Sequence, residues 1–264
     1  MIIVSPQLNP VALQLGPLAI HWYGIAYLFG FLGLRWFLRR QGQALPFQVH
    51  LLDDLLFYAL WGVLLGGRIG YMVFYQTQWL IAQPLELLYL WHGGMSFHGA
   101  FIGASLGLKR FASKHKLALM DLTDVIVPWV PITLGVGRIA NWVNGELWGR
   151  PTHADWGMIY PWVDQQLRYP SQLIECFLEG FLLFVVLCCF KIRCRASGQL
   201  TALFIILYAL CRLVAECFRA PDPQLGFLLM GQVTMGQILS FVMLFFGFVL
   251  CWRAGRRSKA ALVS

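Results

Sequence analysis

Long apolar runs separated by short polar segments form the main pattern of this chain. Seven runs approach the roughly 20 residues that an α-helix needs to cross the hydrocarbon core of a membrane. The fourth contains Pro128 and Pro131 and the third is short, so we expect these two to be the least regular. The pattern predicts an all-α integral membrane protein, a seven-transmembrane helix bundle. Its predicted spans lie near residues 18–38, 52–75, 95–111, 122–143, 171–191, 199–218 and 233–252.

The composition excludes an ordinary soluble domain. Hydrophobic residues make up 59% of the 264 positions and charged residues 12%, whereas soluble domains carry about 25% charged residues. The mean hydropathy is +0.66. Because no linker or low-complexity stretch interrupts the chain, we expect one polytopic membrane domain over residues 1–264. No charged segment precedes the first apolar run, so we expect that run to be retained as a span.

Positive charge is distributed unevenly over the predicted loops. Lysine and arginine in short loops stay on the cytoplasmic side of a membrane. They gather in alternate loops and in the C-terminal tail, and all the lysines fall on that side. This predicts an N-terminus outside and a C-terminus in the cytoplasm. The formal net charge of +8 then reflects topology, and we do not expect nucleic-acid binding because the basic residues are split among short loops.

Two outer segments are long enough to fold. Residues 76–94 carry Trp79, Tyr89 and Trp91, which suit an amphipathic arm lying at the membrane interface. Residues 145–170 mix tryptophan, proline and aspartate and predict a small outer cap. Within the second and third spans, glycines recur every four residues and permit close contact between helices. These glycines are Gly62, Gly66, Gly70, Gly99, Gly103 and Gly107.

Ionisable side chains at the end of the fourth span are the strongest indication of function. Such a group at membrane depth costs about 2.5 to 3.5 kcal/mol on insertion scales, so Arg138 and Glu146 need a compensating role. On a helix, Arg138, Asn141 and Gly145 share one face, whereas Asn144 and Glu146 point to the flanks. Arg138 and an amide could therefore present donors to a phosphate headgroup. Alternatively, Arg138 pairs with Glu146 or with a carboxylate of another span only to hold the bundle together.

Two other spans also carry arginines. In the sixth, Arg212, Glu216 and Arg219 line one stripe, so that Glu216 can bridge both cations. Arg219 lies nearest the outer surface and is a candidate for the second half of an anion clamp, whereas Arg212 and Glu216 could equally fix helix register. Arg68, between glycines of the second span, is either a substrate-binding or a structural residue.

His98 and Tyr23 are candidates near the outer interface. His98 follows a glycine pair and opens the third span, where it could act as a general base at neutral pH. A structural role is equally open for a lone histidine. Tyr23 is either an anchor at the membrane interface or a residue that lines the site. The seven cysteines show neither a zinc spacing nor a disulfide framework. Because no metal or nucleotide motif appears, we expect no cofactor.

At residues 137–150, the segment GRIANWVNGELWGR resembles the signature of the bacterial phosphatidylglycerol:prolipoprotein diacylglyceryl transferases. Further segments agree with that family in the same order, so the resemblance covers essentially the whole chain. Trp142 and Cys217 depart from the usual residues. The agreeing segments are HWYGIAYLFGF at 21–31, GGRIGYMVFY at 66–75, GGMSFHGAFIG at 93–103, YPSQLIE at 169–175, ECFRAPD at 216–222 and MGQILS at 235–240.

The resemblance implies a multi-pass enzyme of the bacterial inner membrane with seven spans and an outer N-terminus. Its activity would be the first step of lipoprotein maturation: the diacylglyceryl group of phosphatidylglycerol moves to the thiol of the lipobox cysteine in a preprolipoprotein, and glycerol phosphate is released. Membrane lipids and lipobox peptides are the implied partners. The resemblance also implies that Arg138 binds the lipid. Further matched site positions are Asn141, Asn144, Glu146, Gly149, Tyr23, His98 and Arg219.

On this interpretation we expect Arg138 and Arg219 to hold the phosphate. Asn141 and Asn144 would hydrogen-bond the headgroup or the backbone, Glu146 would orient an arginine, and His98 would accept the thiol proton. Two other functions remain open. Inward arginines also line transport paths, so a transporter or flippase for an anionic lipid or solute is the alternative. A noncatalytic scaffold built around polar bundle contacts is the third.

Overall fold

The computed structural model describes residues 3–6, 8–16, 18–89, 93–194, 196–221, 228 and 232–263. Residues 90–92 of the predicted arm and Asp222 of one agreeing segment lie outside them. The chain divides into two compact units. Unit 1 comprises Met1–Gly33 and Ile126–Ser264, and unit 2 comprises Leu34–Val125. Helix α1 (Trp22–Gln41) belongs to both, and each unit is described by itself.

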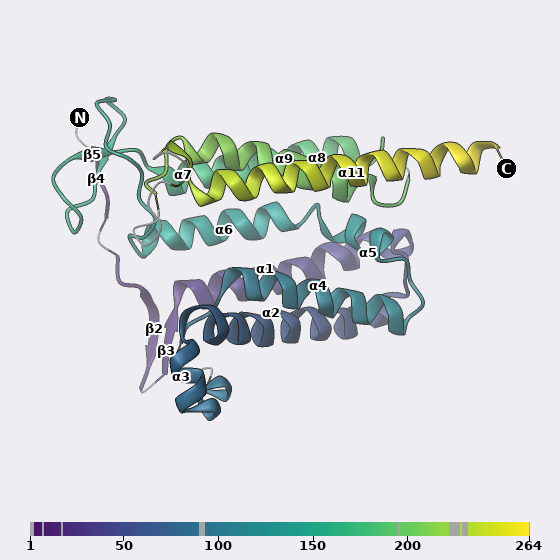
Figure 1. Cartoon of the computed structure of the whole chain (residues 1–264), viewed down its shortest axis with the longest axis horizontal. Coiled ribbons are helices and arrows are strands. Elements are labelled where there is room, and N and C mark those ends of the chain that lie inside the picture. The colour runs from purple at the N-terminus through teal and green to yellow at the C-terminus, as the bar shows by residue number, and fades with distance from the viewer. Residues whose placement is uncertain are drawn as a thin grey trace. The chain divides into compact units, whose positions relative to one another are not determined.

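Unit 2 is built on the helix pair α2 (Leu52–Tyr75) and α4 (Phe97–Lys114), which pack side by side (Figure 1). The predicted glycine contact between them is confirmed, because a Cβ on Gly66 would overlap with the carbonyl oxygen of Gly99. Ser96 caps α4 by accepting a hydrogen bond from the Gly99 amide at 3.2 Å. The remaining elements are η1 (Gly42–Ala44), η2 (Val49–Leu51), α3 (Thr77–Ala82), η3 (Pro84–Leu88) and most of α5 (Leu119–Ile126).

Unit 1 gathers the helices that carry most of the predicted site. They are α6 (Val130–Val143), α7 (Ser171–Glu175), η5 (Cys176–Leu182), α8 (Leu183–Lys191), α9 (Gln199–Glu216) and α11 (Met235–Val263). The segments α7, η5 and α8 form one continuous helix with a π-helical middle. Its packing on α6 is close, because Gly135 and Gly180 leave no room for a Cβ between their backbones.

Short strands accompany the helices of unit 1. Strands β1 (Ile3–Val4), β4 (Met158–Ile159) and β5 (Leu167–Arg168) form a sheet in which β4 pairs parallel with β1 and antiparallel with β5. Strands β2 (Val11–Leu15) and β3 (Leu18–His21) form an antiparallel hairpin. The all-α prediction is therefore corrected: the described chain is mostly helical but includes these strands, two of which lie in the predicted cap.

The fourth predicted span is interrupted as expected. Between α5 and α6, residues 127–129 form a turn, and Pro131 occupies the first turn of α6, where its missing N–H is not needed. The helix ends at Val143, followed by Asn144 and by Gly145 with φ +68°. Glycine adopts this left-handed conformation without steric penalty. The turn leaves Glu146 at the start of the outer segment.

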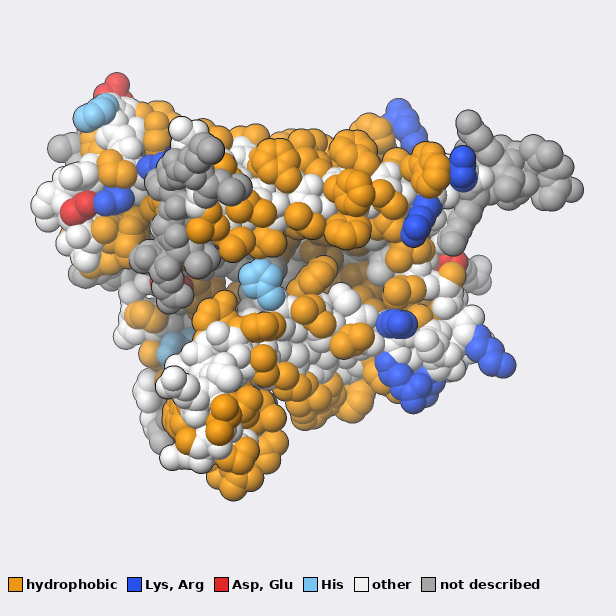
Figure 2. Space-filling model, viewed as in Figure 1, with side chains coloured by type: hydrophobic (Ala, Val, Ile, Leu, Met, Phe, Trp, Pro, Cys, Tyr) orange, Lys and Arg blue, Asp and Glu red, His pale blue; other side chains and the backbone are white. Residues whose placement is uncertain are grey.

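Several helices are long and apolar enough to cross a membrane. Within the described ranges these are Val49–Tyr75, Ser171–Lys191, Gln199–Glu216 and Met235–Arg256, and α5 with α6 would give a fifth, broken span. Apolar side chains cover the outer faces of the helices (Figure 2). For example, Phe245 of α11 is 65% exposed. Such apolar surface suits contact with lipid. The predicted count of seven adds α1 and α4 and stays a prediction.

Candidate functional site

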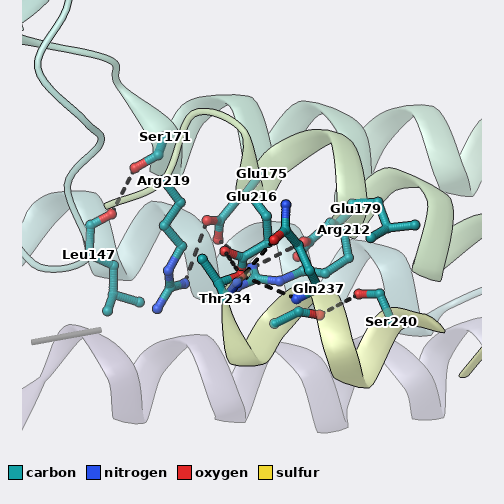
Figure 3. Close-up of polar contacts among 12 residues, drawn as sticks. Leu147, Ser171, Glu175, Glu179, Arg212, Glu216, Arg219, Thr234, Gln237 and Ser240 are labelled. Atoms are coloured by element: carbon teal, nitrogen blue, oxygen red, sulfur yellow. Dashed lines mark hydrogen bonds and ion pairs between the residues drawn. The ribbon is translucent and has the colours of Figure 1, made fainter. Parts of the chain in front are cut away.

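A cluster of buried charges lies inside unit 1, between the helix Ser171–Lys191, α6 and α9 (Figure 3). Glu175 and Glu179 come from the helix Ser171–Lys191, four residues apart. Glu179 lies within the π-helical turn, a type of local distortion that is frequent at functional sites. Both carboxylates are almost fully buried, with 1% and 0% of the side chain exposed.

Arg138 projects from α6 into this cluster. Its Nε lies 2.8 Å from Glu175 Oε2, and its Nη2 lies 3.0 Å from Glu179 Oε2. Both Nε and Nη2 donate hydrogen bonds to Glu179 Oε2. The sequence left two roles open for Arg138, phosphate binding and pairing with a carboxylate. These contacts show pairing with two carboxylates of another predicted span. A guanidinium in this position retains donors and charge that a phosphate can share.

The arginines of α9 and of the turn after it reach the same carboxylates. Arg212 Nη1 lies 3.4 Å from Glu175 Oε2 and 3.4 Å from Glu179 Oε1, and Nη2 donates to Glu216 Oε1. Arg219 Nη1 lies 3.5 Å from Glu175 Oε1. Glu216 is held further by the Thr234 hydroxyl, which donates to Oε2 at 3.0 Å. The predicted partners Arg138 and Arg219 are thus brought to one carboxylate, Glu175.

The cluster is formally neutral over the part of the chain that the structure describes. Three guanidiniums (Arg138, Arg212 and Arg219) face three carboxylates (Glu175, Glu179 and Glu216). Within the sixth predicted span two arginines face one carboxylate, and the helix Ser171–Lys191 provides the other two carboxylates. Burial of so many charges is tolerated only when each has partners, since an isolated buried charge costs several kcal/mol.

A second polar group lies where α1 meets the end of α6. The Tyr23 hydroxyl donates a hydrogen bond to Glu146 Oε2 at 2.7 Å and accepts one from the Asn141 amide. The partner that the structure gives Glu146 is therefore a tyrosine, where the sequence suggested an arginine. Asn141 and Arg138 occupy the same helix but have different partners. This hydrogen-bonded chain places Glu146, which is exposed, beside the phenol.

The signature segment after α6 is held by hydrogen bonds to its backbone. Ser171 donates to the carbonyl of Leu147 at 2.8 Å, and Gln172 donates to the carbonyl of Glu146 at 2.6 Å. Gly149 pairs with Arg219 in an isolated bridge, and a Cβ there would overlap with the carbonyl oxygens of Tyr169 and Phe218. Gly149 is therefore needed for close backbone approach, which aligns the segment with Arg219. Asn144 follows α6, and its buried Oδ1 accepts no hydrogen bond from the described residues.

The cap carries an ion pair that ties it to the signature. Arg168 donates to both carboxylate oxygens of Asp164, at 3.1 and 2.5 Å, and to the carbonyl of Gly149 at 3.1 Å. The guanidinium holds the pKa of Asp164 below its usual value. Tyr160 is buried and donates to Gln172 Oε1 at 3.0 Å. Its burial raises the pKa of Tyr160 to about 12.

The remaining two candidates, His98 and Arg68, belong to unit 2. His98 is exposed in the first turn of α4. Arg68 is 2% exposed and donates to the carbonyls of Gly93 and Glu86, while its Nη2 lies 3.8 Å from Glu86 Oε2. These contacts connect α2 to η3 and to the loop before α4. They favour the structural one of the two roles left open for Arg68.

Glu175 and Glu179 are the site residues that sequence reasoning missed. Two carboxylates four residues apart within an apolar run of 21 residues are themselves a signal, because ionisable side chains at membrane depth face the bundle interior. The resemblance included Glu175 in the segment YPSQLIE, but no role followed from it.

Comparison with known proteins places the chain among similar sequences. The family model for prolipoprotein diacylglyceryl transferase matches residues 10–253. The phosphatidylglycerol–prolipoprotein diacylglyceryl transferase of Legionella pneumophila (strain Paris) is 48% identical over 250 residues, covering 94% of this chain and 97% of that protein. The one from Chromohalobacter salexigens is 47% identical, covering 93% and 92%. The one from Nitrosomonas europaea is 45% identical, covering 98% and 96%.

Proposed function

The chain belongs to the prolipoprotein diacylglyceryl transferase family, and on that premise we propose the reaction that its site performs. The diacylglyceryl group of phosphatidylglycerol is transferred to the thiol of a lipobox cysteine in a preprolipoprotein. The products are a thioether and glycerol phosphate. One observation carries the proposal: Arg138, Arg212 and Arg219 converge on the buried carboxylate of Glu175 within a mostly apolar helix bundle.

The reaction is a displacement at the glyceryl carbon that bears the phosphate. The cysteine sulfur attacks this carbon, the carbon–oxygen bond breaks, and the electron pair leaves with the phosphate oxygen. A free thiol has a pKa near 8.5 and is mostly protonated at neutral pH, so its proton must pass to a base. The leaving oxygen gains negative charge. Preorganised guanidiniums stabilise this charge more in the transition state than in the diester ground state.

In this proposal Arg138 and Arg219 hold the phosphate. Both reach Glu175 from different elements, which provides the convergence that a tetrahedral anion requires. Gly149 aligns the backbone of Arg219. Asn141 and Asn144 would hydrogen-bond the headgroup or the backbone, and His98, a residue of unit 2, stays the candidate acceptor of the thiol proton.

The hydrogen-bonded chain of Asn141, Tyr23 and Glu146 defines the outer wall of the proposed site. Glu146 is an acceptor for the Tyr23 hydroxyl, which fixes the phenol beside the end of α6. The finer topology belongs to the same proposal: seven spans in the bacterial inner membrane, an outer N-terminus, an interfacial arm at 76–94 and a cap at 145–170.

A double-label assay tests the reaction. Full-length protein in proteoliposomes receives phosphatidylglycerol labelled separately in the acyl chains and in the headgroup, together with a lipobox peptide. We expect acyl label on the peptide and an equal amount of headgroup label released as glycerol phosphate. A peptide whose lipobox cysteine is replaced by alanine is the control and should acquire no label. Movement of lipid across the bilayer without peptide labelling would support a flippase instead.

A further inference from the structure

The three carboxylates of the buried cluster do not hold the arginines in the same way. Glu179 accepts two aligned hydrogen bonds from Arg138, from Nε at 3.3 Å and from Nη2 at 3.0 Å. Glu216 accepts an aligned hydrogen bond from Arg212 and another from Thr234. These two carboxylates fix the guanidinium planes of Arg138 and Arg212, because charge-assisted hydrogen bonds are strong and directional.

Glu175 is different, because it contacts all three arginines but accepts no aligned hydrogen bond. Its oxygens lie 2.8 Å from Arg138, 3.4 Å from Arg212 and 3.5 Å from Arg219. Both oxygens are buried and lack a hydrogen-bond partner among the described residues. The carboxylate is therefore held by charge alone at the point where the guanidiniums converge. Figure 3 shows Glu175 directed toward Arg219 at this point.

A phosphate matches the same point better than this carboxylate does. The phosphodiester of the lipid also carries one negative charge. Its two non-ester oxygens lie on a tetrahedral phosphorus, so they can accept from guanidiniums that approach from several directions, whereas the oxygens of a carboxylate lie in one plane. An anion that offered these hydrogen bonds would compete with Glu175 for the arginines. Glu179 and Glu216 would keep the guanidiniums of Arg138 and Arg212 in place during the exchange.

We propose that Glu175 is a positioning residue that acts as a displaceable counter-anion, occupying the arginines between turnovers and yielding them to the phosphate of the lipid. The inference rests on the proposed function and deepens it. Glu175 keeps the cluster neutral and lowers its affinity for phosphate. The product glycerol phosphate is a phosphomonoester that also binds guanidiniums, so the return of Glu175 to the arginines promotes product release as well.

The proposal predicts effects of opposite sign for two neighbouring carboxylates. Glu175→Gln removes the competitor and keeps the side-chain volume, so we expect about fivefold or more tighter inhibition by glycerol phosphate. The KM for phosphatidylglycerol should fall in the same direction. Glu179→Gln is the matched variant. It removes the acceptor that orients Arg138, so we expect kcat to fall to about one tenth of the wild-type value or below. Inhibition by the product should not become tighter.

The test uses the full-length protein in proteoliposomes. Initial rates are measured against phosphatidylglycerol and against added sn-glycerol phosphate, and protection by glycerol phosphate against thermal unfolding gives a readout that is independent of turnover. Glu175→Gln should show both stronger inhibition and stronger protection. A folded Glu175→Gln protein with unchanged or weaker glycerol phosphate binding would overturn the proposal.

A second variant covers the case in which Glu175→Gln does not fold. Glu175→Asp keeps the charge but shortens the side chain by one methylene, so it should also bind glycerol phosphate more tightly, to a smaller extent. Wild-type binding in this variant, or failure of both variants to fold, would make Glu175 a structural counter-ion and reject the proposal. The outcome for the proposed function is separate: wild-type protein that binds glycerol phosphate but forms no thioether would contradict the reaction itself.

Discussion

Units 1 and 2 hold their helices together by different means. In unit 1, Glu175 and Glu179 lie inside the bundle among guanidiniums, with 1% and 0% of their side chains exposed. In unit 2, α2 and α4 meet through glycine backbone, and the Arg35–Asp53 ion pair leaves the aspartate side chain 71% exposed. Water resolvates an exposed charge whose partner is removed, but it does not reach a buried one. Close glycine contacts occur in both units, but unit 1 adds a cluster of three arginines and three glutamates, whereas the buried Arg68 of unit 2 donates to backbone carbonyls.

The largest effect is expected for Arg138→Ala, which tests the dependence of unit 1 on charge. The substitution leaves Glu175 and Glu179 with one partner fewer in a buried setting. Breaking a buried ion pair costs about 3–5 kcal/mol. Loss of a donor for the leaving oxygen should lower the rate about 10²- to 10³-fold. Thermal unfolding and the rate of thioether formation measure the two effects.

The control for this prediction is Arg253→Ala. Arg253 also lies in a long apolar helix, α11, but its side chain is exposed. We expect nearly wild-type unfolding and rate for this variant. If Arg138→Ala behaved in the same way, the buried cluster would be neither a stabilising element nor a phosphate clamp.

The steric packing of unit 2 is tested by Gly66→Ala. A Cβ at this position would overlap with the Gly99 carbonyl oxygen and with the Cα of Gly103, so α2 and α4 must separate. Overpacking of this kind costs about 1–3 kcal/mol. The unfolding temperature should fall accordingly. Gly255→Ala provides the comparison, because no atom lies within 4 Å of a Cβ at that position of α11. Equal melting of the two variants would show that the glycine contact is not limiting.

A smaller effect is expected for Tyr23→Phe, which removes one hydroxyl from unit 1 without changing a charge. Glu146 loses a donor, and the Asn141 amide loses an acceptor. A net loss of about 1 kcal/mol is typical for one hydrogen bond. Tyr27→Phe is the control on the same helix, since that side chain is 57% exposed. The two variants are compared by thermal unfolding and by the KM for phosphatidylglycerol. Indistinguishable results would assign the hydroxyl no role.

Local patterns in the sequence predicted the features of the fold that depend on neighbouring residues. Pro128 and Pro131 predicted that the fourth span would be irregular, because a proline beyond the first turn of a helix removes a hydrogen bond and clashes with the preceding turn. The four-residue glycine spacing predicted the contact of α2 with α4. The two-residue strands were not predicted, because no periodicity develops over so short a length. The paired strands β1 and β4 are also far apart in the sequence, with Ile3 opposite Met158 and Val4 opposite Ile159.

Which residues form the candidate site depends on which helix faces meet in the fold. Arg138 could be recognised as a candidate from its position in an apolar run, but its partners Glu175 and Glu179 lie about 40 positions further along the chain. The hydrogen bond from Tyr23 to Glu146 joins residues 123 positions apart. No local pattern encodes such pairs. Several ionisable residues could therefore be identified from the sequence. The partner of Glu146 was predicted to be an arginine, because the sequence does not show which helix provides that partner.

The smallest effect concerns a partly exposed ion pair of unit 1, which separates the effect of burial from the effect of location in this unit. Asp164 is paired with Arg168 in the cap, and its side chain is 29% exposed. The pair lowers the pKa of Asp164 in the folded protein. Its stabilisation is therefore complete above the unfolded-state pKa of about 3.9 and is lost as the pH falls through the lower, folded-state value. Thermal unfolding of the wild type and of Asp164→Asn between pH 7 and pH 3 should differ slightly at neutral pH and converge in acid. If the difference in unfolding temperature persisted unchanged in acid, the Asp164 side chain would act through packing. If the difference were large at neutral pH, charge would contribute throughout unit 1, irrespective of burial.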